Sequence, residues 1–260
     1  MMDHSQIFPI SGGLRVLMIG IEFMIAYFCF QFAAIFIIRY YLRTKKSFYS
    51  LTKKYSGLQH FKEQVDEYMN LLKDRELAWG SLFLMLGLMY LFFIIADFYT
   101  PSQEIRVIFL TMGYAFYICG ITVLTYSLEK NELRKTNFLY TKLLGIILSG
   151  FFLSIFIDTN IAKTISSFSL IISIFAILHY GKVIWIRVKG LRRLALPVYA
   201  LFFGFFLLFL GFLATTDQAN LIFGIIARLL GDLTQLIAIA MFALAFYFLP
   251  SFSEFDWVDK

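Results

Sequence analysis

Seven apolar stretches, each long enough to cross a bilayer as a helix, constrain this chain more than any other feature. They cover residues 14–38, 78–99, 105–127, 138–158, 163–186, 195–214 and 219–249. A spanning helix needs about 20 apolar residues because the hydrocarbon core is about 30 Å thick. The composition agrees, since 60% of the residues are hydrophobic and only 15% are charged, against about half and a quarter in soluble domains. We therefore predict an all-α integral membrane protein, a seven-transmembrane helix bundle.

Lys and Arg are concentrated on one side of these predicted spans. The alternate connections 39–77, 128–142, 182–194 and 251–260 hold nineteen of the 23 basic residues, and the opposite side holds three. Cytoplasmic loops carry the excess of positive charge, so the N-terminus is predicted outside and the C-terminus in the cytoplasm. All three tryptophans fall at predicted cytoplasmic boundaries, where an aromatic belt is expected. These are Trp79, Trp185 and Trp257.

This topology divides the chain into three predicted parts in a multi-pass protein of the cell membrane. Residues 1–13 form a short extracellular N-terminus, 14–250 the membrane domain and 251–260 a cytoplasmic tail. The basic, aromatic segment 39–54 is predicted to contact anionic inner-leaflet lipids, at about 1 kcal/mol per charge, so no nucleic-acid partner is needed to explain it.

Residues 57–77 show apolar positions at three- and four-residue spacing, with charged residues on the other faces. This pattern predicts an amphipathic helix between the first two spans, resting on the inner leaflet or extending the second span into the cytoplasm. A short coiled coil that pairs two subunits into a homodimer is the alternative.

Four polar residues lie deep within predicted spans: Glu22 in the first, and Arg228, Asp232 and Gln235 in the last. The spacing of the last three puts them on one face of a helix. Glu22 and Arg228 lie about 12–14 Å into spans that both enter from outside. Because the first and last helices of a closed ring are neighbours, we expect Glu22 and Arg228 to meet.

Two hypotheses explain these four residues, because intramembrane charges need a partner in either case. In the first, Glu22 and Arg228 form a structural clasp that closes the ring. In the second, two acids facing one base leave a site for a ligand, a proton or a small cation, with one carboxyl kept neutral by desolvation.

The remaining polar residues suggest less. His179, near the inner end of the fifth span, is a candidate pH-sensitive group, and no metal site is predicted because His4 and His60 lie far from it. Asp97 and Arg106 flank the first outer turn and are interpreted as solvated boundary charges. Glycines inside the spans are expected to permit close helix contacts. They are Gly113, Gly120, Gly145 and Gly150.

No phosphate-binding loop, His-Glu-x-x-His sequence, cysteine pair or acidic metal cluster occurs in the sequence. We therefore predict neither an enzyme nor a cofactor, and assign no catalytic residues. The last predicted span contains no lysine, so a retinal Schiff base there is not expected.

The layout resembles the N-terminal seven-transmembrane sensory regions of prokaryotic signalling proteins. The similarity lies in the short outer connections and in a last helix that runs through Phe248, Leu249 and Pro250 into the polar segment 251–257. It implies a sensory function and a cytoplasmic signalling partner. Since the sequence stops at Lys260, the resemblance further implies a lone receptor or a chain truncated before an output domain.

The sequence leaves three functions open. The first is a sensory or receptor-like protein that responds to a small, lipophilic or protonic stimulus near Glu22, Arg228 and Asp232. The second is a transporter or proton-coupled carrier that uses the same residues. The third is a non-catalytic membrane scaffold. The apolar run from Leu236 to Leu244 favours sensing, because a carrier needs a polar path that continues inward.

Overall fold

The computed structural model describes residues 12–54, 59–100, 102–131, 133–155, 165, 168–169, 171–180, 182, 192–215 and 222–248. Within these ranges the chain is helical and contains no strand. The elements are α2 (Gly12–Lys54), α3 (Gln59–Ile94), the π-helix η1 (Ile95–Tyr99), α4 (Gln103–Asn131), the 3₁₀ turn η2 (Arg134–Thr136), α5 (Leu139–Ile155), α7 (Arg192–Ala214) and α9 (Ile225–Phe248). A further apolar helix covers Ile171–Tyr180.

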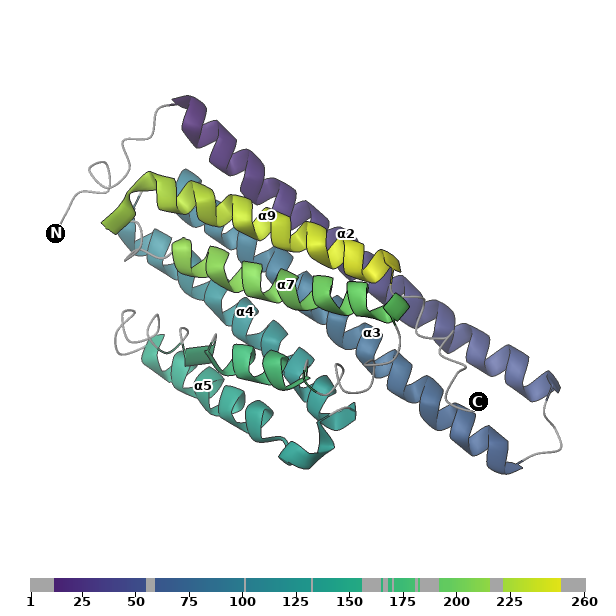
Figure 1. Cartoon of the computed structure of the whole chain (residues 1–260). Coiled ribbons are helices and arrows are strands. Elements are labelled where there is room, and N and C mark those ends of the chain that lie inside the picture. Colours follow the sequence, from purple (N-terminus) through teal and green to yellow (C-terminus); the bar gives the residue numbers. More distant parts are fainter. Residues whose placement is uncertain are drawn as a thin grey trace.

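The helices pack as a bundle in which neighbours in sequence are mostly neighbours in space (Figure 1). The pairs α2–α3, α3–α4, α4–α5 and α7–α9 are in contact. In addition α2 packs against α9, so the first and last helices of the described chain lie side by side. This contact confirms the expected closure between the two helices that carry Glu22 and Arg228.

Four helical segments are long and apolar enough to cross a membrane: Gly12–Tyr41, Glu76–Tyr99, Glu104–Asn131 and Ile225–Ala245. Three shorter apolar helices cover Leu139–Ser154, Ile171–Tyr180 and Tyr199–Ala214. The chain is therefore a helical membrane protein with four candidate spans. Most of the predicted span 163–186 lies outside the described residues, and the count of seven and the orientation stay predictions.

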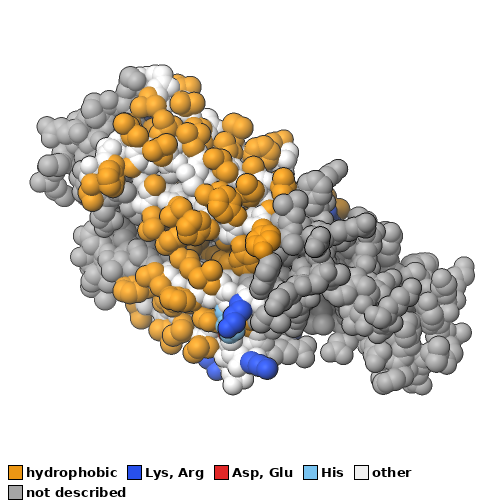
Figure 2. Space-filling view, in the orientation of Figure 1, with side chains coloured by type: hydrophobic (Ala, Val, Ile, Leu, Met, Phe, Trp, Pro, Cys, Tyr) orange, Lys and Arg blue, Asp and Glu red, His pale blue; other side chains and the backbone are white. Residues whose placement is uncertain are grey.

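The outer surface of the bundle has the apolar character that lipid requires. Large aliphatic and aromatic side chains are exposed on every helix with described side chains, including Val16 (70%), Ile146 (69%) and Phe223 (70%). Figure 2 shows hydrophobic side chains over most of the described face, with Lys and Arg gathered toward its lower edge. Some charged side chains, including Glu22 and Arg228, are instead buried inside. Apolar outside and charged inside is the pattern of a bundle solvated by hydrocarbon.

An aromatic core fills the middle of the bundle. Phe83 of α3 stacks on Phe36 of α2 with ring centres 6.0 Å apart, and meets Phe242 of α9 edge-on at 5.8 Å. Phe205 of α7 contacts Phe242 at 4.9 Å. Trp79 is buried among these rings, 6.2 Å from Phe83. Trp79 lies near the start of the candidate span Glu76–Tyr99, as predicted for a boundary residue, but its side chain packs into the core and does not face lipid. Trp185 and Trp257 lie outside the described residues.

The helices α2 and α3 both continue past the other helices as an antiparallel pair (Figure 1). Residues 59–77 are helical, as their periodicity predicts, but they are the first turns of α3 and not a separate element. Of the two placements considered, this geometry matches an extension of the second span. The coiled-coil hypothesis depends on side chains that lie outside the described part of the chain.

Glycines allow two pairs of helices to approach closely. A Cβ at Gly113 or Gly120 of α4 would come within 2.5 Å or 2.9 Å of α3 side chains, as predicted. A Cβ at Gly211 of α7 would lie 2.3 Å from Cγ of Gln235 and 2.8 Å from the carbonyl oxygen of Gly231. In contrast, no atom of the described residues lies within 4 Å of a Cβ at Gly145, so the close contact predicted there is not formed within the described part of the chain.

At the far end of α4, the buried carboxylate of Glu129 caps the start of α5. It accepts hydrogen bonds from the backbone N–H groups of Tyr140 (3.0 Å) and Thr141 (2.7 Å), and from the hydroxyls of Thr136 (2.6 Å) and Thr141 (2.5 Å). The first N–H groups of a helix have no partner within the helix, and negative charge is favourable there. Glu129 therefore fastens α5 to α4.

Candidate functional site

Arg228 of α9 is the centre of a buried group of charges. Its Nη2 donates to Oε1 of Glu22 on α2 at 2.9 Å and to Oδ2 of Asp97 in η1 at 2.6 Å. Its guanidinium also lies 5.3 Å from the ring centre of Phe98, a cation–π contact. The predicted meeting of Glu22 and Arg228 is confirmed, and a third helix joins it through Asp97.

Asp97 and Arg106 belong to this group, and their interpretation as solvated boundary charges was wrong. Nε and Nη2 of Arg106 both donate to Oδ1 of Asp97, at 3.0 and 2.9 Å. The side chains are only 10% and 8% exposed. Each oxygen of Asp97 thus accepts from a different arginine, Arg106 on Oδ1 and Arg228 on Oδ2. Asp97 joins α4 to α9.

The backbone around Asp97 explains why this residue turns inward. The five residues that follow α3, Ile95–Tyr99, form the π-helix η1. The wider turn of a π-helix changes the direction in which later side chains point. The helix then stops before Pro101, where Thr100 Oγ1 donates to the carbonyl of Ile95 at 2.7 Å. Ser102 Oγ accepts from the Ile105 N–H at 3.3 Å and so caps the start of α4.

Asp232 and Gln235 lie on the same face of α9 as Arg228, as their spacing predicts. Both are almost fully buried, at 2% and 1% exposure. Oε1 of Gln235 accepts a hydrogen bond from the hydroxyl of Tyr90 on α3. We call the seven side chains the polar cluster: Glu22, Tyr90, Asp97, Arg106, Arg228, Asp232 and Gln235.

The polar cluster has more acids than bases. Glu22, Asp97 and Asp232 face Arg106 and Arg228, so one negative charge is in excess when every group is ionised. The sequence predicted two acids and one base at this place. The structure adds one acid, Asp97, and one base, Arg106, so the excess of one negative charge is unchanged. Arg15 approaches the same end of the bundle but donates to the backbone carbonyl of Phe98.

Several buried polar atoms of the cluster have no hydrogen-bond partner among the residues that the structure describes. They include Oε2 of Glu22, Oδ2 of Asp232 and Nε2 of Gln235, and Nε of Arg228 makes no hydrogen bond in the described ranges although Nη2 of the same side chain makes two. A buried polar atom without a partner costs about 1–3 kcal/mol. A group of such atoms in one place indicates a site that is completed by something other than these side chains.

The residues that carry these atoms line a cavity of about 310 Å³ enclosed by α2, α3, η1, α4, α7, α9 and the Ile171–Tyr180 helix. Its wall combines the charged groups with the rings of Tyr90, Phe93, Tyr114, Tyr117, Phe209 and Phe212. A volume of this size lies at the lower end of the range for small-molecule sites, about 300–1,000 Å³. The cavity can hold a proton, water or a small polar molecule. No group of three His, Cys, Asp or Glu side chains suited to a metal occurs in the described ranges.

His179 lies away from the polar cluster. Its Nδ1 is 3.2 Å from the hydroxyl of Tyr140 on α5, and the two rings meet edge-on with centres 6.0 Å apart. This contact joins the Ile171–Tyr180 helix to α5. Its predicted pH sensitivity stays a prediction, and the structure gives it no place in the cavity.

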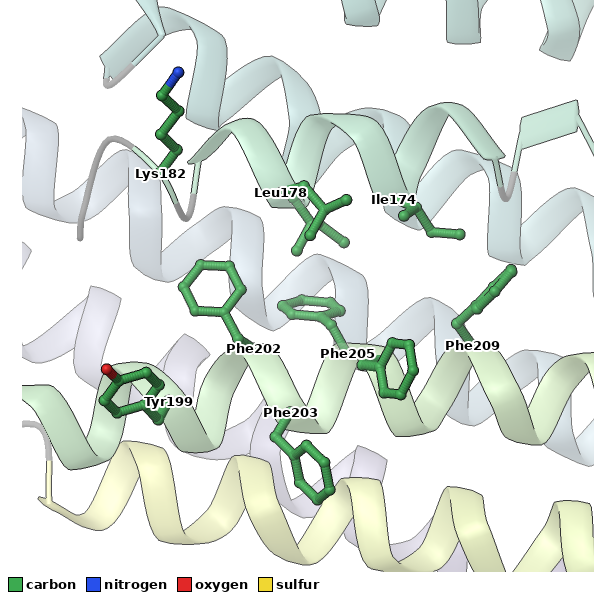
Figure 3. Close-up of a pocket in the computed structure, with 10 residues that line it drawn as sticks. Ile174, Leu178, Lys182, Tyr199, Phe202, Phe203, Phe205 and Phe209 are labelled. Carbon is green, nitrogen blue, oxygen red and sulfur yellow. The ribbon is translucent and has the colours of Figure 1, made fainter. Parts of the chain in front are cut away.

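A larger, mostly apolar groove of about 740 Å³ lies between the Ile171–Tyr180 helix and α7 (Figure 3). Ile174 and Leu178 face Phe202, Phe205 and Phe209 across it. Lys182 stands at one end with its amine directed away from the groove. Although larger, this groove offers no group of polar atoms comparable to the polar cluster. The smaller cavity is therefore the candidate site.

No protein-family model matches the chain, and neither a curated protein nor a solved structure shows significant similarity to it. The site must therefore be interpreted from its own geometry.

Proposed function

We propose that the chain is a sensory membrane protein whose stimulus acts at the polar cluster. The observation that supports it most directly is Arg228, which bridges Glu22 of α2 and Asp97 after α3 beside a cavity with unpartnered polar atoms. One arginine thereby links three helices to a place where a small stimulus can bind. The proposed orientation, N-terminus outside, puts this place in the outer half of the membrane.

A stimulus that neutralises the excess charge would change what Arg228 binds. When a proton occupies Glu22, the attraction that holds α9 to α2 weakens and Asp97 becomes the main partner of Arg228. Neutralising Asp232, which lies on α9, instead removes its repulsion with Glu22 and draws the two helices together. A ligand shifts such an equilibrium only by its difference in affinity for the two states. The response would be a small displacement of α9, which leads toward the tail 250–260 and a cytoplasmic signalling partner.

The aromatic core supports sensing over the alternative, a transporter. Toward the far end of α9, the polar cluster gives way to Phe83, Phe205 and Phe242, which fill the bundle with rings in mutual contact. Of these, Phe83 and Phe242 are at most 1% exposed. Carriers need a polar path across the membrane in at least one state, whereas a sensor needs only a movable helix.

Distance measurements on nanodisc-embedded protein test the proposal. Nitroxide labels would be placed at Leu244 on α9 and Val123 on α4, both exposed, after both native cysteines are changed to alanine. Lowering the pH from alkaline to mildly acidic should shift the distance between the labels. The same step in the Glu22→Gln, Asp232→Asn double variant should leave it unchanged.

Proteoliposomes that contain a pH-sensitive dye separate the two functions. A sensor gives a label shift without proton flux, while proton flux that disappears in the double variant would establish the carrier. If neither the acid step nor the amine probe described below moves α9, the sensory proposal is wrong and the third function, a membrane scaffold, gains support.

A further inference from the structure

The geometry points to a small organic cation, a protonated primary amine with an aromatic or short alkyl group, as the ligand of the cavity beside Asp232. This inference rests on the proposed function and names the chemical class of its stimulus. It is carried by the cavity, by the unpartnered buried atoms of residues that line it and by the aromatic side chains in the same lining.

The first reason is the distribution of charge around the cavity. Asp97 binds both arginines and Glu22 binds Arg228 through Oε1, so the ion pairs of the two guanidinium groups are directed at Asp97 and Glu22. Asp232 is 2% exposed and its Oδ2 has no hydrogen-bond partner in the described ranges, and the same holds for Oε2 of Glu22. An ammonium group has three N–H donors and a positive charge. It would donate to the unpartnered oxygens of both carboxylates, and its charge would balance the negative excess of the cluster.

The second reason is the aromatic wall. Tyr90 and Phe212 stack with ring centres 6.4 Å apart, and Tyr117 meets Phe212 at 5.4 Å. On the other side, Phe93 and Tyr114 form an edge-to-face pair at 5.2 Å. Aromatic faces attract cations and pack against flat apolar groups. The cavity thus offers a charged end and an apolar end, as an aryl-alkylamine requires.

Two other ligand classes fit less well. An anion would have to displace Asp97 or Glu22 from the arginines and would increase the negative excess. A hard metal ion prefers six or more oxygen ligands, but the unpartnered carboxylate oxygens of the cavity come from only two residues. The neighbouring rings suit an organic cation, whereas the unpartnered amide N–H of Gln235 needs an acceptor that an ammonium does not supply.

Calorimetric titration of the full chain in nanodiscs tests the inference with three probes of one shape. 2-Phenylethylamine is the cation, 2-phenylethanol its neutral counterpart and phenylacetate an anion. We expect the amine to bind at least about tenfold more tightly than the other two, because a charge-assisted contact is worth about 1.5–3 kcal/mol. Asp232→Asn should reduce amine affinity by about tenfold or more.

Two further variants keep the result interpretable. Glu104→Gln removes an exposed carboxylate of α4 outside the cavity and should leave amine affinity unchanged. Ile171→Trp fills the rim of the cavity without touching a charge and should weaken the binding of all three probes. If Asp232→Asn does not fold, loss of amine binding in Ile171→Trp still supports the site, and unchanged binding there overturns it.

The outcome separates this inference from the proposed function. If the amine binds but the distance between the labels at Leu244 and Val123 does not change, the ligand class is supported and the sensory function is overturned. An acid-induced shift in α9 without amine binding would keep sensing and overturn the ligand class. Equal affinity for the amine and the alcohol would likewise show that the charge excess does not select the ligand.

Discussion

Glu129 and Asp232 are both acidic, both buried and both in helices of the same bundle, yet their surroundings differ completely. Glu129 is 1% exposed and its two oxygens accept four hydrogen bonds at the start of α5. Asp232 is 2% exposed, and its Oδ2 has no hydrogen-bond partner among the described residues. A carboxylate with every oxygen satisfied stabilises the fold, whereas one left incomplete costs stability. We therefore interpret Glu129 as a structural acid, and our proposal gives Asp232 the functional role.

Arg228→Gln should have the largest effect, because it leaves Glu22 and Asp97 facing each other without their shared cation. Removing one partner of a buried ion pair typically costs about 3–5 kcal/mol. Equilibrium unfolding in detergent micelles would measure the loss. The Glu22→Gln, Arg228→Gln double variant is the control and should recover part of it. Wild-type stability in Arg228→Gln would mean that the pair contributes little.

The charge swap Glu22→Arg with Arg228→Glu tests the simple clasp of two residues. Since Asp97 lies 2.6 Å from Nη2 of Arg228, the new glutamate at position 228 would face a second carboxylate. We therefore expect the swapped protein to remain less stable than wild type in the same unfolding assay. Full recovery of both stability and the response of α9 would instead show that the pair only closes the ring.

Glu129→Ala should lower the free energy of unfolding by about 2 kcal/mol, because the first N–H groups of α5 lose their acceptor. The response of α9 to acid should persist, since Glu129 is not part of the cavity wall. The same label pair on Leu244 and Val123 measures this. A lost response in a variant that still folds would remove the distinction between the two acids.

Gly211→Ala tests how firmly α7 holds the face of α9 that carries Gln235. The added methyl would collide with Cγ of Gln235 and the carbonyl oxygen of Gly231, so we expect a loss of about 1–2 kcal/mol. Gly145→Ala is the matched control, since that methyl meets no atom of the described residues within 4 Å, and alanine is the better helix former by about 1 kcal/mol. Thermal unfolding of both variants side by side gives the comparison.

Asp232→Asn should change stability least, by less than about 1 kcal/mol and in either direction, because the native carboxylate is already incompletely bonded. Its effect should appear in function, as loss of the α9 response and of amine binding. A large destabilisation would show that Asp232 is a structural acid like Glu129, and the contrast between them would disappear.

Part of the site could be predicted by counting residues. Matching depths indicated that Glu22 would meet Arg228, and helical spacing placed Asp232 and Gln235 on the same face. Asp97 could not be placed in this way, because the ends of a span are uncertain by a few residues. Each residue is about 1.5 Å along a helix, so that uncertainty moves a charge from the membrane surface into the bundle.

The remaining features depend on local geometry that hydropathy does not encode. Nothing in the apolar run before Asp97 indicates that Ile95–Tyr99 forms a π-helix. Similarly, Glu129 meets the start of α5 only because the chain turns back through Asn137 and Phe138, whose φ angles are 50° and 59°. In both cases the sequence places an acidic residue, Asp97 or Glu129, next to a predicted helix end. The direction in which that side chain points depends on the geometry of the turn, which the sequence pattern does not give.

The helix α2 is longer than the distance over which the surface charge of a bilayer acts. At about 1.5 Å per residue, its 43 residues extend about 65 Å, roughly twice the hydrocarbon thickness. If Tyr41 marks the membrane boundary of an upright helix, the backbone of Lys54 lies about 20 Å beyond it. That exceeds two Debye lengths at physiological salt, about 8 Å each. An anionic surface at that boundary would therefore attract mainly the first basic residues of 39–54, and its field would be largely screened at the position of Lys54.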